Sequence, residues 1–129
     1  MKTVLQPHGS KMCGQACVAM AAGLSLPEAI HRMDKHRATG FTDIRKALIL
    51  SGLTVGAKTE RVKYHGKRAQ NIPKRAIAKL RHKDKTNAHF VLWWDGKMYD
   101  PEEYLPYAKR RNWYATSFLR ILRPPRGKQ

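Results

Sequence analysis

The chain has 129 residues, the size of one ordinary domain, and 42% of them are hydrophobic, which is enough for a single core. It contains no apolar run near the roughly 20 residues that a membrane-spanning helix needs, and Lys2 is not followed by an apolar segment with a cleavage site. These features argue against membrane and secreted proteins. We therefore expect one soluble, cytoplasmic domain over residues 1–129.

Charge is the second strong signal. Lys and Arg number 26 against 9 Asp and Glu, which gives a formal net charge of +17. Such a field attracts polyanions and acidic proteins. The basic residues concentrate in residues 57–85 and 108–129, and residues 124–129 predict a loose basic tail. Aromatic and basic residues interleave over residues 99–114, which suits nucleic-acid binding, but we favour a core-packing segment with a solvated charged face.

Three helices are predicted in the first part of the chain. Residues 12–22 are small or apolar at nearly every position and are followed by a glycine, so this helix is expected to be buried on most sides. Ser25, with a glutamate three residues later, forms a capping box for a helix over residues 25–35. A third helix is predicted over residues 42–52, with Thr42 as the N-cap.

Strands are predicted in the second part. The clearest signal is the pair of apolar runs that flank Asp95-Gly96, a dipeptide typical of two-residue hairpin turns. Helices followed by antiparallel strands indicate an α+β fold rather than alternating βαβ units. The predicted strands are residues 53–57, 75–82, 88–94, 97–100 and 117–124, with residues 58–74 mostly loop.

A cysteine at the start of the first predicted helix points to nucleophilic chemistry. A thiol attacks as thiolate, and a helix N-terminus or a nearby imidazolium lowers its pKa. Cys13 occupies this place, and Gly14 beside it would let a substrate backbone approach. Among the six histidines His89 is the best partner, because it opens the most apolar strand. Asp100, fixed at a corner by Pro101, is placed to orient the imidazole.

These residues resemble a known family. Gln6, the Cys13-Gly14 pair, the run HFV from His89 and the run YDP at Asp100 resemble the papain-like cysteine peptidases, and most closely their compact C39-like branch. The resemblance covers about residues 5–102. It implies a papain-like fold, with N-terminal helices packed on a C-terminal antiparallel sheet. It also implies a cysteine peptidase or isopeptidase acting on a peptide or protein substrate, and the positive charge would attract an acidic one.

The resemblance assigns a role to four residues. Cys13 would be the nucleophile, His89 the general base and then acid, and Asp100 the residue that orients His89. Gln6 would donate its side-chain amide to the oxyanion, with the backbone N–H of Cys13 as the second donor. Seven positions separate Gln6 from Cys13, where the family usually has six, and Pro7 fills the usual place. The resemblance implies no cofactor or metal.

Other readings of the same residues stay open. Cys13 alone would equally suit a buried structural thiol, and Cys17 is expected in the core. A zinc site from His8, Cys13, Cys17 and His89 would abolish the nucleophile, and the four-residue cysteine spacing is unusual for zinc. At the level of function, the alternative is a catalytically idle, peptidase-like basic protein that binds an acidic protein partner or nucleic acid.

Overall fold

A computed structural model describes residues 1–7, 10–83, 88–102 and 113–123. Three helices come first, α1 (Cys13–Ala22), α2 (Leu26–Met33) and α3 (Phe41–Leu50), and the strands follow. Every strand pair is antiparallel, so the predicted α+β class is confirmed. The predicted tail at 124–129, His8 and residues 103–112 of the aromatic and basic stretch at 99–114 lie outside the described residues.

The first two helices form for the reasons that the sequence suggests. All ten residues of α1 are buried, because every position except Gln15 is small or apolar. In α2 the Ser25 hydroxyl accepts the Glu28 N–H at 3.2 Å, and the Glu28 carboxylate accepts the Ser25 N–H at 3.0 Å. This is the predicted capping box. The helix ends at Met33, earlier than predicted, because Asp34 turns into the left-handed region with φ 53°.

Helix α3 begins earlier than predicted, and the assignment of Thr42 as its cap is wrong. Gly40 is the N-cap, and its N–H donates to the Asp43 carboxylate at 3.3 Å. The same carboxylate pairs with Lys35 at 3.0 Å, which ties α3 to the end of α2. Phe41 is drawn into the first turn because its ring packs edge-on against Phe90, with centroids 5.1 Å apart.

The described strands form one six-stranded sheet and a separate hairpin. The order in the sheet is β1-β8-β5-β6-β7, and β2 also pairs with β8. The strands of the sheet are β1 (Thr54–Val55), β2 (Glu60–Arg61), β5 (Ala76–His82), β6 (Ala88–Trp94), β7 (Lys97–Tyr99) and β8 (Trp113–Arg123). The separate hairpin consists of β3 (Tyr64–His65) and β4 (Arg68–Ala69).

The sheet confirms some strand predictions and corrects others. Asp95 and Gly96 form the predicted turn between β6 and β7, with φ of 52° and 82° as a primed hairpin turn requires. The stretch 58–74, predicted as mostly loop, contains β2, β3 and β4. Each has two residues, too few to show an alternating pattern. Strand β8 begins at Trp113, earlier than predicted.

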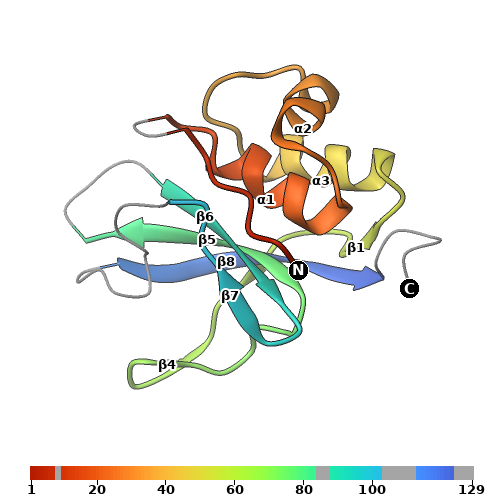
Figure 1. The fold of residues 1–129 in the computed structure, drawn as a ribbon. Coiled ribbons are helices and arrows are strands. Elements are labelled where there is room, and N and C mark those ends of the chain that lie inside the picture. Colours follow the sequence, from red (N-terminus) through yellow and green to blue (C-terminus); the bar gives the residue numbers. More distant parts are fainter. Residues whose placement is uncertain (8–9, 84–87, 103–112, 124–129) are drawn as a thin grey trace.

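The three helices lie together over one face of the sheet (Figure 1). The helix-side core joins α1 and α3 to residues such as Ile77, Phe90 and Leu119, and a smaller cluster around Phe118 covers the opposite face. The adjacent Trp93 and Trp94 pack on opposite faces, and both are half-buried. Within the described ranges, no single helix is both long and apolar enough to cross a membrane, although the bent pair α1–α2 passes that test when taken together.

Candidate active site

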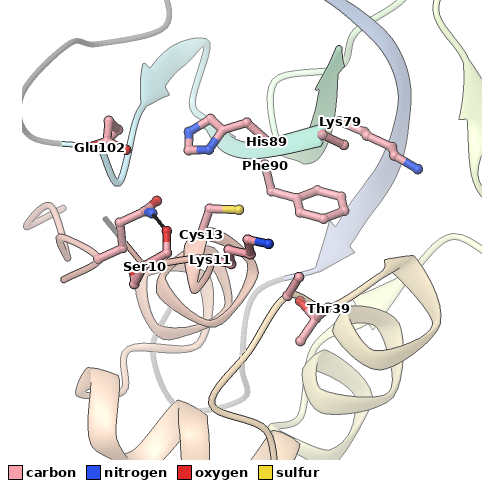
Figure 2. Close-up of a pocket in the computed structure, with 11 residues that line it drawn as sticks. Ser10, Lys11, Cys13, Thr39, Lys79, His89, Phe90 and Glu102 are labelled. Atoms are coloured by element: carbon pink, nitrogen blue, oxygen red, sulfur yellow. Dashed lines mark hydrogen bonds between the residues drawn. The ribbon is translucent and has the colours of Figure 1, made fainter. Parts of the chain in front are cut away.

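A cavity of about 370 Å³ opens where the start of α1 meets β6. Gln6, Cys13 and His89 all line it, so the structure brings three of the four predicted site residues to one place. Figure 2 shows Cys13 on the helix side and His89 on the sheet side, with Glu102 at the left of the view. The described residues that complete the lining are Ser10, Lys11, Ala38, Thr39, Lys79, Ala88, Phe90 and Glu102.

The fourth residue, Asp100, lies behind His89. Strand β7 runs back along β6, with Tyr99 opposite Leu92, so the residue after β7 reaches the start of β6. There the Asp100 Oδ1 atom lies 2.9 Å from His89 Nε2 and also accepts the Glu102 N–H at 2.9 Å. Both side chains of the His89–Asp100 pair are almost fully buried, with 5% and 6% exposed.

This pairing decides which ring nitrogen can act as a base. Because Nε2 is engaged by the carboxylate, it carries the proton of the neutral imidazole, and Nδ1 is the acceptor. Figure 2 shows one ring nitrogen of His89 turned toward the side of the cavity where Cys13 lies. A buried carboxylate behind the ring also stabilises the imidazolium that forms when Nδ1 takes up a proton.

The protonation of Cys13 differs from the expectation. Burial raises the pKa of the Cys13 thiol above its ordinary value, and hydrogen bonds from the backbone N–H groups of Phe90, Gly14 and Cys13 itself offset only part of that rise. The predicted lowering of the pKa by the helix start is therefore wrong in its net sign, because Cys13 is only 8% exposed. Cys13 rests as a neutral thiol and needs a base to take its proton.

Gln6 reaches the cavity although its spacing from Cys13 is one residue longer than in the family. Its backbone N–H donates to the Pro101 carbonyl at 2.9 Å, which ties the segment to the strand end beside Asp100. Its side-chain Nε2 donates to the Ser10 carbonyl at 2.8 Å. An amide nitrogen has two hydrogens, so this bond orients the group and leaves one hydrogen for another acceptor.

Gly14 has a different role from the predicted one. It is buried, and a Cβ atom placed on it would lie 2.2 Å from Thr39 Oγ1 and 3.3 Å from Ile44 Cδ1. The glycine therefore lets the segment between α2 and α3 pack against the start of α1. Substrate approach is not what its missing side chain permits here, because Thr39 and Ile44 already fill that side.

Gln15 is a structural residue of the site that the sequence analysis missed. It is fully buried, and its Nε2 donates to the carbonyls of Lys35 at 3.1 Å and Arg37 at 2.7 Å. These bonds hold the 34–40 segment, which supplies Ala38 and Thr39 to the cavity wall. The sequence did carry a signal, since Gln15 is a large polar residue within an otherwise small and apolar helix.

The second cysteine lies in the core, as expected. Cys17 has no exposed surface, and burial raises its pKa well above the ordinary value. Both cysteines are free thiols. Within the described part of the chain, no three His, Cys, Asp or Glu side chains are grouped to hold a metal ion. His8, a proposed zinc ligand, lies outside that part.

The chain matches no family model, and no curated protein matches it. The cavity and its chemistry therefore carry the functional argument.

Proposed function

We propose that the chain is a thiol hydrolase, a cysteine peptidase or isopeptidase, with Cys13 as the nucleophile and His89 as its base. The observation that carries the proposal is the meeting of Cys13 and the His89–Asp100 pair, with its 2.9 Å bond, at one cavity. A helix that begins with the cysteine and packs on an antiparallel sheet that carries the histidine also supports a compact papain-like fold. Free cysteines suit a reducing compartment.

The mechanism follows from the neutral resting thiol. When a peptide carbonyl enters the cavity, His89 Nδ1 takes the Cys13 proton while Sγ attacks the carbonyl carbon. The tetrahedral intermediate collapses to a thioester, and the imidazolium gives its proton to the leaving amine. His89 then takes a proton from water, whose oxygen attacks the thioester. The carboxylic acid leaves, and the proton returns to Sγ.

The developing oxyanion has two donors in this proposal. One is the second amide hydrogen of Gln6 Nε2, and the other is the backbone N–H of Cys13, which lies in the first turn of α1 and has no intrahelical acceptor. Removing one donor of this kind lowers kcat by a factor of roughly 100 to 1,000. Gln6→Ala should therefore slow turnover far more than it weakens substrate binding.

Alkylation with iodoacetamide tests the activated pair, with the labelled peptides mapped by mass spectrometry. We expect Cys13 to react at pH 7 and Cys17, in the same chain, to stay unlabelled. His89→Ala should slow the Cys13 reaction by about tenfold or more, whereas His31→Ala, on an exposed position of α2, should leave it unchanged. Equal labelling of the two cysteines, or no effect of His89→Ala, would contradict the proposal.

Peptide-bond cleavage needs its own assay. A library of peptides from digested cell extract, incubated with the protein, should yield new termini with the wild type and none with Cys13→Ala. A peptide aldehyde should block both cleavage and alkylation, because it forms a hemithioacetal on Sγ.

The raised pKa of Cys13 also favours a second candidate, a catalytically idle basic protein that binds an acidic partner or nucleic acid. The two functions differ in their dependence on the thiol. Steeply salt-dependent binding to plain DNA that is unaffected by Cys13→Ala, together with no cleavage in the library, would favour the idle protein.

A further inference from the structure

The helix-side face of the sheet continues past the cavity along the β5–β8 pair. Lys79 is paired with Phe90 on one side and with Ser117 on the other. Paired residues share a face, and Phe90 belongs to the helix-side core, so Lys79 and Ser117 point to the helix side as well. Arg81 lies two residues further along β5 and shares this face, because successive side chains of a strand alternate between its two faces.

Tyr114 completes this surface, because it is paired with Arg81. The β5–β8 register shifts at a bulge between Lys79 and Leu80. Beyond the bulge Tyr114 is still paired with Arg81, so both side chains point to the helix side. We name the side chains of Lys79, Arg81, Tyr114 and Ser117 the shelf.

The shelf begins inside the candidate active site. Lys79 lines the same cavity as Cys13 and His89, and Figure 2 shows its side chain leading away from His89, past Phe90. Lys79 is half-buried, Arg81 is exposed and Tyr114 is 48% exposed. A chain that leaves the cavity along this face therefore meets two cations and a phenol in succession.

The shelf carries two positive charges beside the cavity. Lys79 and Arg81 are like charges on one face, and in the described residues no carboxylate lies within ion-pair distance of Lys79. Partial burial, and then the neighbouring Arg81, lower the pKa of Lys79. A negative group held beside Lys79 would offset the cost of burying its charge.

We propose that the shelf binds an acidic segment of the peptide whose scissile bond lies at Cys13. The choice of a peptide and the position of that bond rest on the proposed function; the attraction of the shelf for a negatively charged segment does not. Carboxylates fit these side chains, since a guanidinium takes a carboxylate by two parallel hydrogen bonds and a phenol adds a donor. A peptide is favoured over a nucleic acid because the shelf is continuous with a cavity whose thiol, base and amide donors suit a carbonyl group.

The binding test uses a fluorophore-labelled octaglutamate peptide and fluorescence anisotropy at low salt. The protein carries Cys13→Ala, so that hydrolysis does not interfere. The shelf variant is Lys79→Gln with Arg81→Gln. The matched control is Lys67→Gln with Arg68→Gln on the exposed β3–β4 hairpin, which removes the same two charges elsewhere.

We expect the shelf variant to bind octaglutamate about tenfold more weakly and the control to bind within about twofold of the parent. Arg81→Gln alone changes an exposed side chain and leaves Lys79 in place. It should give part of the loss, which a folding defect at Lys79 cannot explain. Equal losses in both double variants would overturn the shelf, because only net charge would then matter. Tighter, shelf-dependent binding of an oligothymidylate of equal length would overturn the choice of a peptide.

The outcome separates the two proposals. If octaglutamate binds through the shelf but Cys13 neither labels nor cleaves, the hydrolase fails and the acidic-peptide site stands. If Cys13 is active but the shelf variant binds octaglutamate as the parent does, the hydrolase stands and the shelf fails.

Discussion

Gly14→Ala tests how closely the 34–40 segment packs on the start of α1. The new Cβ would lie 2.2 Å from Thr39 Oγ1, more than 1 Å inside ordinary contact, and 3.3 Å from Ile44 Cδ1. Overpacking of this kind costs about 1–3 kcal/mol, while alanine gains up to about 1 kcal/mol over glycine in a helix. The free energy of unfolding of the variant should therefore be about 1–2 kcal/mol lower than that of the wild type.

The double variant with Thr39→Ala separates the clash from other effects. Thr39 Oγ1 is buried with no hydrogen-bond partner among the described residues, so its removal alone should be close to neutral. Without that oxygen, Gly14→Ala should become neutral or stabilising, which gives a coupling energy of about 1–2 kcal/mol. Urea unfolding of the four proteins measures this. If Gly14→Ala has the same effect with and without Thr39, the packing argument is wrong.

Three further predictions follow from the site and the core. Asp100→Asn removes the charge that stabilises the His89 imidazolium, so iodoacetamide alkylation of Cys13 at pH 7 should slow by about tenfold; an unchanged rate would mean that the pair is only structural. Because the pKa of Cys17 is raised in the folded state, the stability that its neutral thiol contributes is complete below the ordinary thiol pKa of about 9 and is lost as the pH rises above it. Urea unfolding from pH 8 to 10 should show that the free energy of unfolding falls less steeply with pH in Cys17→Ala than in the wild type, by up to about 1.4 kcal/mol per pH unit. Equal slopes in the two proteins would contradict this. Gln15→Leu should cost about 1–3 kcal/mol and speed amide exchange between α2 and α3, because two carbonyls lose their donor; unchanged exchange there would refute the role of Gln15.

The sequence predicted those parts of the fold that depend on local patterns. The capping box at Ser25 and the turn at Asp95-Gly96 are set by neighbouring residues, so they were predicted correctly. The start of α3 was misplaced because a contact between Phe41 and Phe90, distant in sequence, decides it. The short strands β2, β3 and β4 exist through pairing alone and leave no periodic pattern.

For the candidate site, the sequence predicted which residues meet but not their electrostatic state. His89 and Asp100 come together because a hairpin of predictable register joins them. The pKa of Cys13 could not be predicted, because its sign depends on how deeply the thiol is buried between α1 and β6. Gln15 went unnoticed because its two acceptors belong to a segment about twenty residues away.

The bond from the Gln6 N–H to the Pro101 carbonyl has a mechanical consequence. It couples the proposed oxyanion donor to the backbone next to the residue that steers the imidazole. A ligand that displaces Gln6 would therefore also move the neighbour of Asp100, and the two ends of the candidate site would shift together.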